Sequence, residues 1–490
     1  MFTPGRMSSE NRQIIIDAIN DLPGSATNEE ILRLAYQLLV AAPEFHVTNI
    51  VRPTSVDRPQ PAALEPATEP YKAIVYFMLA GGADTYNLLV PHTCSPDMYS
   101  QYAAIRKNIS LPRDSLHQIS ATGQVCSTFG LHPRLEILKE LYDDGDAAFF
   151  ANTGVLFEYS TKDDYIIKNP TQLFAHNKMQ QETKFVDVHR EVAGTGVLGR
   201  MIGRLNQQGF TVNGISLANQ ADVVVGEAGV APAAISLNYR GVESFDPRPS
   251  VADMPQNIED LNKLTNITSS LYGESWSDVF INAIAENNRI KEALDVSSSE
   301  LAGNWTPATS IESQLAMVAR LIRAHDSIYR EAERDVFYVE LGGWDTHDDV
   351  LERFDARIDI VAQAIEAFSQ ELKIQGNFDK VTTVVASEFA RTLTPNSGQG
   401  SDHAWGGNYF MFGGDVNGGR VHGTYPDDLS ETGPLGLGTG RLLPTSSWDH
   451  PFFGITQWFG LTTEEDMDYV LPNWRSFPQA DLFSAAEMFN

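Results

Sequence analysis

Two apolar runs that end directly in polar clusters constrain this chain more than any other feature. Residues 381–385 (VTTVV) form a β-branched run typical of a buried strand, and the polar cluster 387–391 (SEFAR) follows at once. Residues 335–343 (DVFYVELGG) lead in the same way into 344–347 (WDTH). A helical pattern at 350–372 separates the two runs, which predicts a β-α-β crossover with both clusters at one edge of a parallel sheet. In open α/β sheets, ligands bind at that edge.

Other segments extend the same α/β pattern. Residues 73–79 (AIVYFML) have the composition of a buried parallel strand, and Gly81 and Gly82 allow a sharp turn ahead of Asp84. The amphipathic pattern at 310–333 predicts a long helix with Ser310 as its N-cap. We therefore expect a large α/β domain.

The N-terminal part reads as a separate piece. Residues 1–52 form a helical segment, whose second helix at 28–45 has Asn28 as the predicted N-cap. Residues 53–70 form a proline-rich linker, and the main domain is expected over 71–490. Because two helices make a poor core, three roles stay open for this arm: packing on the main domain, mediating homo-oligomers or assembly, or being the remnant of a larger precursor.

Charge excludes one class of partner. The formal net charge of -29 would repel a nucleic acid, and no basic block offsets it. No run of 18 apolar residues is present, which predicts no membrane span, and no signal-peptide pattern begins the chain. We expect a secreted or extracellular protein in a form processed from a longer precursor.

Cysteines and glycosylation motifs bear on the compartment. Cys94 and Cys126 are the only cysteines, and they could pair in a secreted protein or stay free in a cytosolic one. Asn-x-Ser/Thr sequons at Asn108, Asn266 and Asn304 fit a secretory route, although such motifs also arise by chance.

The polar clusters carry the residue types that hold divalent metals. Aspartate, glutamate and histidine ligands converging from several strand ends suit zinc, manganese or iron, and a carboxylate-rich set tolerates magnesium or calcium. Two such ions would stabilise the attacking and leaving oxygens of an ester displacement. Arg391 could hold a phosphate or sulfate oxyanion. Singly, each residue is more often structural; together they predict a site for one or two metals at Asp84, Asp345, His347, Glu388, Asp402 and His403.

A set of ordered motifs resembles a known family. They are GGADTYNLLVP, GTGVLGR, ELGGWDTH, SEFARTL, SDHAWGGNYFMFGG with GGRVHG, and GRLLPTSSWD, and they run from about Tyr71 to the C-terminus. Together they resemble the bacterial domain of unknown function 1501, which looks like a branch of the alkaline phosphatase and sulfatase superfamily. The resemblance implies an alkaline phosphatase-like α/β core, with a mostly parallel central sheet flanked by helices and a short N-terminal helical arm. Residues 28–45 resemble the tail of a second domain of unknown function, 1800.

By this resemblance, Asp84 is the first-strand ligand and Asp345 with His347 belongs to the aspartate and histidine pair of a later strand. Glu388 stands where the superfamily's usual Asp-His pair has its aspartate. Asp402 and His403 are either the ligands that come late in the chain or the usual Asp-His pair itself.

The nucleophile of the superfamily is a serine, threonine or formylglycine, and here the resemblance puts Ala175 in its place, beside His176 as a catalytic group. Alanine cannot attack. Ser160 is the alternative nucleophile, and water activated by a metal needs no serine.

Two functions follow from these residues. The first is a metal-dependent hydrolase that acts on a small phosphate or sulfate ester. The second is a catalytically inactive secreted protein that uses the same fold to bind an extracellular polymer or to assemble. Ala175 and the acidity favour the second, whereas the retained ligands favour the first.

Overall fold

A computed structural model describes most of the chain: residues 6–48, 51, 64, 66–190, 194–219, 221–242, 253–263, 270–296 and 300–490. It divides into two compact units, one of residues 1–66, 241–297 and 327–330 and the other of 67–240, 298–326 and 331–490. Most of the predicted linker and the sequon at Asn266 lie outside the described residues.

The first unit is helical. The N-terminal helices share an apolar core with two later helices, in which Ile15, Leu34, Leu38, Ile258 and Leu261 are buried. The predicted N-terminal helices therefore belong to a core that is completed by α9 and α10, which lie far along the chain. The helices are α1 (Ser9–Asn20), α2 (Asn28–Ala41), α3 (Pro43–His46), α9 (Met254–Asn262) and α10 (Leu271–Asp295).

Both predicted N-caps were wrong by one residue. Thr27 caps α2: its hydroxyl accepts a hydrogen bond from the Glu30 backbone N–H, and the Glu30 carboxylate accepts one from the Thr27 N–H. Thr309 caps the later helix in the same way with Glu312. A Thr-x-x-Glu capping box satisfies two backbone donors at once, so it defines the helix start ahead of Asn28 and Ser310.

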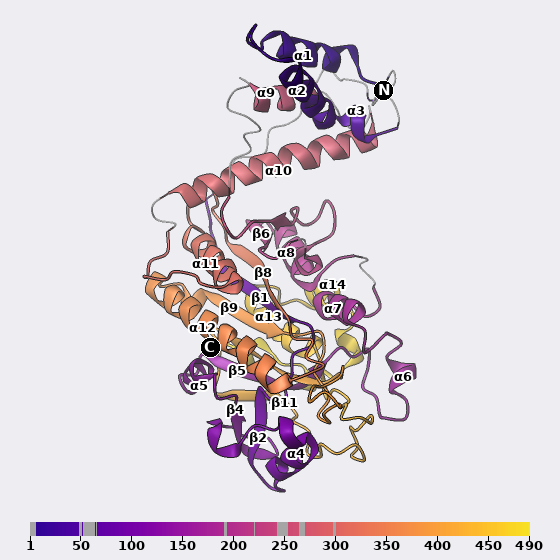
Figure 1. Cartoon of the computed structure of the whole chain (residues 1–490), viewed down its shortest axis with the longest axis vertical. Helices are drawn as coiled ribbons and strands as arrows, with labels where there is room; N and C mark the ends of the chain where they lie inside the picture. The colour runs from indigo at the N-terminus through magenta and orange to yellow at the C-terminus, as the bar shows by residue number, and fades with distance from the viewer. Residues whose placement is uncertain are drawn as a thin grey trace. The chain divides into compact units, whose positions relative to one another are not determined.

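The second unit contains a nine-stranded sheet (Figure 1). Its order is β11-β5-β10-β9-β1-β8-β6-β7, with β12 paired to β5. All pairs are parallel except those of β10, which runs antiparallel to β5 and β9. The predicted mostly parallel α/β sheet is thus confirmed. The strands are β1 (Lys72–Ala80), β5 (Ala147–Gly154), β6 (Val212–Ser216), β7 (Ile235–Ser236), β8 (Arg334–Gly342), β9 (Val381–Ala386), β10 (Gly407–Phe412), β11 (Arg420–Gly423) and β12 (Ser446–Ser447).

Helices cover the sheet. On one side α11 contacts β8 and α12, and α5 contacts α12 and β5. On another, α8 packs on β6 and β8 and contacts α14, which contacts α13. The helices are α4 (Met98–Arg106), α5 (Glu136–Asp143), α6 (Tyr165–Lys168), α7 (His176–Phe185), α8 (Val197–Gln207), α11 (Ser310–Arg323), α12 (Val350–Gln375), α13 (Asp449–Phe459), α14 (Glu464–Val470) and α15 (Ala485–Met488).

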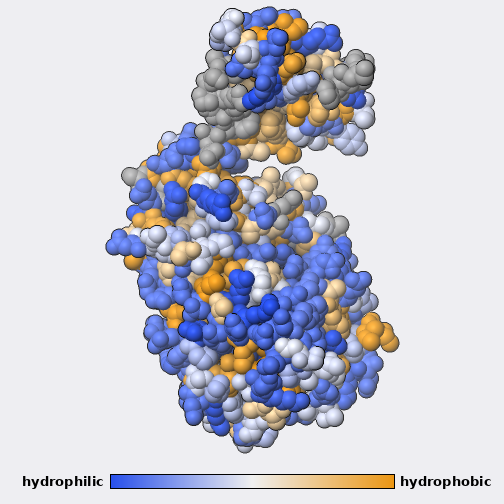
Figure 2. Space-filling view, viewed as in Figure 1, coloured by the Kyte–Doolittle hydropathy of each residue, from blue (hydrophilic) through white to orange (hydrophobic). Residues whose placement is uncertain are grey.

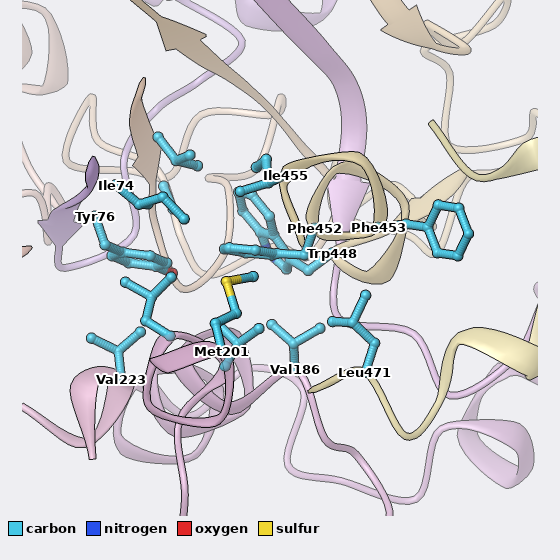
Figure 3. Close-up of a cluster of buried hydrophobic side chains, with 14 of the residues drawn as sticks. Ile74, Tyr76, Val186, Met201, Val223, Trp448, Phe452, Phe453, Ile455 and Leu471 are labelled. Atoms are coloured by element: carbon cyan, nitrogen blue, oxygen red, sulfur yellow. The ribbon is translucent and has the colours of Figure 1, made fainter. Parts of the chain in front are cut away.

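One core lies between β1 and the helices α8 and α13 (Figure 3). Ile74 and Tyr76 point from β1 toward Met201 of α8 and Phe452 of α13, and all four are buried. This packing accounts for the apolar run that predicted the strand, since a parallel strand covered on both faces is apolar throughout.

The predicted helix over 310–333 was too long. It ends at Arg323, and the Ala332 N–H donates to the carbonyl of His325 to close a turn that leads the chain into β8. The helical periodicity continued past the point where the chain turns back toward the sheet.

A smaller sheet lies beside these elements in the same unit. It has the order β2-β4-β3, from β2 (Leu89–Cys94), β3 (His117–Ser120) and β4 (Cys126–Leu131). Cys94 and Cys126 face each other across β2 and β4 and form a disulfide. Of the two alternatives that the sequence left open, the structure therefore has the paired one.

Candidate functional site

Four segments meet at one edge of the main sheet. Asp84 follows β1, Asp345 and His347 follow β8, and Glu388 follows β9. These three strands are mutually parallel, so their carboxyl ends share an edge. Because β10 runs antiparallel to β9, the residues that precede it, which include His403, lie at the same edge. The crossover read from the sequence is confirmed.

A glycine turn after β1 brings the backbone close to this cluster. Gly81 has φ of 130°, and a Cβ there would lie 2.6 Å from the Asp345 backbone nitrogen. The Gly81 N–H donates to the Glu388 carboxylate at 2.9 Å. Only glycine fits this position, and its backbone N–H helps to hold Glu388.

Three imidazoles and one carboxylate form the centre of the site. The Nε2 atom of His403 lies 3.0 Å from Nε2 of His176 and 3.0 Å from Nε2 of His347. Asp345 Oδ1 lies 3.0 Å from Nε2 of His347, 3.4 Å from that of His403 and 3.5 Å from that of His176. We call these four residues the histidine cluster.

The other nitrogen of each ring is bound to an oxygen. His176 Nδ1 lies 2.8 Å from Glu388 Oε1, and His347 Nδ1 lies 3.0 Å from Asp402 Oδ1. His403 Nδ1 lies 2.8 Å from the Phe174 carbonyl oxygen. Carbonyl oxygens and ionised carboxylates only accept, so each Nδ1 carries a proton, and the Nε2 of a ring without a second proton presents a lone pair.

Lone pairs that face one another at these distances repel unless a cation lies between them. Ligands on a tetrahedron around zinc, with Zn–N bonds of about 2.0–2.1 Å, are about 3.3 Å apart. The donor atoms of His176, Asp345 and His403 lie within 4.8 Å of one another. A second-shell oxygen on each ring is the usual support of metal-binding histidines. The donor set therefore fits a transition metal ion.

Two predicted ligands lie behind the histidines. Burial favours a high pKa for Glu388, but hydrogen bonds from His176, Gln180 and the Gly81 N–H bring the pKa below its ordinary value. Asp402 is similar: burial opposes ionisation, and hydrogen bonds from Asn396 and His347 lower its pKa. Both carboxylates are therefore ionised acceptors at neutral pH, in positions that orient imidazoles.

Arg391 is fully buried and its donors are occupied. Nε donates to the Gly82 carbonyl at 2.8 Å and Nη1 to the Ser401 carbonyl at 3.0 Å, while Nη2 contacts the Gly81 carbonyl and Asp345. Partial burial would raise the pKa of Asp345, but the hydrogen bond and charge of Arg391 lower it. Within the described residues, Arg391 thus fixes Asp345 and leaves little capacity for a substrate oxyanion.

Asp84 is set apart from the histidine cluster. It is fully buried and forms an ion pair with Arg106 of α4. Burial raises the pKa of Asp84, opposed mainly by Arg106. The structure thus gives Asp84 a cationic side-chain partner and does not group it with the three histidines.

The predicted catalytic residues fall in two places. His176 begins α7 directly after Ala175 and belongs to the histidine cluster. Ser160 accepts a hydrogen bond from Asn169 at 3.1 Å and has no hydrogen bond to the cluster among the described residues. From the sequence, His176 was predicted as a catalytic group and not as a metal ligand. It lies four residues before Gln180, on the same face of α7, and both side chains contact Glu388. This spacing is the sequence feature that could have placed His176 at the site.

One family model covers the region that holds the site. The model of the family described as Protein of unknown function (DUF1501) matches residues 71–432, which include the whole histidine cluster. No curated protein matches the chain. Among solved structures, the chain is similar to the lipoteichoic acid synthase LtaP from Listeria monocytogenes, with 9% identity, 76% of this chain and 74% of that chain covered, and a TM-score of 0.28.

Proposed function

This chain belongs to the DUF1501 family of proteins of unknown function, and we propose that it is a metal-dependent hydrolase of phosphate or sulfate esters. One observation supports the metal site: Nε2 of His403 lies 3.0 Å from Nε2 of both His176 and His347, while each Nδ1 is held by an oxygen. The ester class rests on the motifs that resemble the alkaline phosphatase and sulfatase superfamily.

We assign four ligands, His176, His347, His403 and Asp345, to a single ion. Three nitrogens and one carboxylate favour zinc, manganese or iron over magnesium and calcium, which prefer oxygen ligands. Glu388, Asp402 and the Phe174 carbonyl orient the rings, and Arg391 holds Asp345. This revises the ligand set expected from sequence, since His176 enters it and Asp84, Glu388 and Asp402 leave it.

Water, not a side chain, is the proposed nucleophile. When bound, a divalent ion in this site supplies Lewis acidity toward the ester and lowers the pKa of water. In the reaction, the oxygen of water bonds to phosphorus or sulfur as the bond to the ester oxygen breaks. The alcohol leaves with one proton of the water; the other stays on the phosphate, or passes to solvent from the sulfate. Ala175 has no hydroxyl, and Ser160 bonds to Asn169 instead of to the cluster.

The test combines metal analysis with turnover. We expect about one transition metal ion per chain, hydrolysis of an aryl phosphate or aryl sulfate, and loss of turnover on chelation with recovery on adding zinc. His403→Ala should lose both metal and turnover. His189→Ala is the matched control, because it removes an exposed imidazole outside the cluster. A wild-type protein without metal and without turnover would refute the proposal.

The alternative function, an inactive binding or assembly protein, is favoured by Ala175 at the position of the superfamily nucleophile. Bound metal without turnover on either ester class would support it. Metals also persist in proteins where they only stabilise the fold. Assembly through the N-terminal helices and binding of an extracellular polymer belong to this alternative and stay predictions.

We also propose a secreted location. Disulfides persist in oxidising compartments, which the Cys94–Cys126 bond fits, and the sequon asparagines Asn108 and Asn304 are exposed. No helix in the described part of the chain is long and apolar enough to cross a bilayer. Processing from a longer precursor remains a prediction.

A further inference from the structure

A cavity borders the histidine cluster. It has a volume of about 460 Å³ and is lined by α6 and the segment that leads from it into α7, which includes Tyr165, Ile166, Leu173, Phe174 and Ala175. The lining continues directly into His176, and the Phe174 carbonyl is the oxygen that holds His403. This volume lies within the range of about 300–1,000 Å³ for small-molecule sites.

The lining is mainly apolar in character. The amide of Asn169 is engaged within the protein: its oxygen accepts from the Phe157 N–H at 2.9 Å, and its nitrogen donates to Ser160 and to the Tyr165 carbonyl. Ile166 is 68% exposed, and Figure 2 shows apolar surface where α6 lies in Figure 1. Thr171 and Gln172 add polar groups to the lining, but most of its surface is apolar, which favours an apolar group in the cavity.

Arg441 adds a cation beside this cavity. Its Nε donates to the His403 carbonyl at 2.8 Å, and its guanidinium carbon lies 4.4 Å from the centre of the Phe174 ring. Among the described residues it has no carboxylate partner, and its Nη1 and Nη2 atoms donate no hydrogen bond. Arg391, in contrast, is saturated by backbone carbonyls and Asp345.

We propose that Arg441 binds the oxyanion of the substrate while this cavity holds its organic group. The substrate class is then a monoester of an aromatic or branched apolar alcohol. The ester itself rests on the function proposed above. A protein with a net charge of -29 repels anions at long range, so a local cation with free N–H groups is needed to retain one.

Binding of non-hydrolysable phosphonates tests the inference without turnover. Titration calorimetry on the full-length, metal-loaded protein would compare benzylphosphonate with methylphosphonate. We expect benzylphosphonate to bind at least about 10-fold more tightly, because its ring enters the cavity. Arg441→Gln should weaken both ligands by about 10- to 100-fold, the range for hydrogen bonds to a charged group. Arg441→Lys should recover part of that loss.

Matched controls test the cavity contact and the Arg441 contact separately. Ile166→Asn should weaken benzylphosphonate alone, whereas Ile167→Asn changes its neighbour, which is exposed and lies outside the cavity lining. Arg420→Gln removes an exposed arginine elsewhere in the unit. Neither control should alter binding, and the metal content and melting temperature of every variant would show that the centre and the fold are intact.

The outcomes distinguish this inference from the proposed function. Equal affinity for the two phosphonates, or no effect of Arg441→Gln, would overturn the inference even if aryl esters are hydrolysed. The expected binding pattern without any ester turnover would support the substrate site and refute the hydrolase.

Discussion

The variant Glu388→Gln tests whether Glu388 binds the proposed metal directly or orients a histidine that does. Glu388 is buried and accepts hydrogen bonds from His176 Nδ1 at 2.8 Å, Gln180 Nε2 at 3.0 Å and the Gly81 N–H at 2.9 Å. Glutamine keeps the shape and one acceptor oxygen but removes the charge that fixes the proton of His176 on Nδ1. The sequence predicts Glu388 as a ligand, whereas in the proposed ligand set Glu388 supports His176.

The size of the effect differs between the two roles. Loss of an outer-shell partner costs about 10- to 100-fold in metal affinity, or about 1.4–2.7 kcal/mol at about 1.36 kcal/mol per tenfold. Loss of a direct ligand would abolish stoichiometric binding. We therefore expect Glu388→Gln to weaken zinc binding by about 10- to 100-fold while one ion still binds. Asp402→Asn should act in the same direction and less strongly, because the Asp402 side chain is 51% exposed.

The assay is competition between metal-stripped protein and a chromophoric zinc chelator at neutral pH. Glu340→Gln is the control, because its carboxylate accepts from Tyr338 at the end of β8 and is outside the cluster. An unchanged zinc affinity in Glu388→Gln would show that Glu388 does not support His176. Complete loss of the ion in a folded variant would return Glu388 to the ligand set.

Three further predictions concern stability and the nucleophile position. Burial raises the pKa of Asp449 to about 6. Folding favours the protonated carboxyl group of Asp449. The stability that depends on this proton is complete below about pH 3.9 and is lost as pH rises through about 6; for two pKa units it is on the order of 3 kcal/mol. Asp449→Asn should remove that pH dependence from urea unfolding, and an identical dependence in both proteins would contradict it. Ala175→Ser adds a hydroxyl at the uncapped N-terminus of α7 and should stabilise the protein by about 0.5–2 kcal/mol in thermal unfolding; a lower melting temperature would argue against a cap there. Replacing Cys94 and Cys126 by alanine opens a loop with a sequence separation of 32 residues and should cost about 3–4 kcal/mol in the unfolding free energy without reductant, and equal stability of the two proteins would count against the disulfide.

Much of the fold could be predicted because the central strands are mostly apolar. Residues 73–79 fall within β1 and 381–385 within β9, and 335–343 match β8 except for the last residue. A parallel strand buried on both faces needs mainly apolar side chains. The polar residues that follow such a run must lie at the sheet edge. That rule placed Asp345, His347 and Glu388 in one region from sequence alone.

The division of roles could not be predicted in the same way. The same sequence pattern fits a carboxylate that binds a metal and a carboxylate that accepts a hydrogen bond from a histidine. Which role Glu388 takes depends on His176, 212 positions away, and which role Asp402 takes depends on His347, 55 positions away. The role of Asp84 likewise depends on Arg106, with which it forms a buried ion pair.

Exposure bears on the choice between a catalytic and a purely structural metal centre. Structural zinc sites are closed by four protein ligands, whereas catalytic ones keep a position open or expand to five-coordinate. With the four proposed ligands, the ion would have a place for water only through such an expansion. The side chains of Asp345 and His347 are 48% and 46% exposed, while those of His176 and His403 are 29% and 23% exposed. The centre is therefore covered on the side of α7 and open on the side of the β8 loop. A site that served only to stabilise the fold would gain from closure on that side too, because water competes for an exposed ion. The open side gives water access to the cluster, and water is the nucleophile that the proposed function requires, because Ala175 has no hydroxyl.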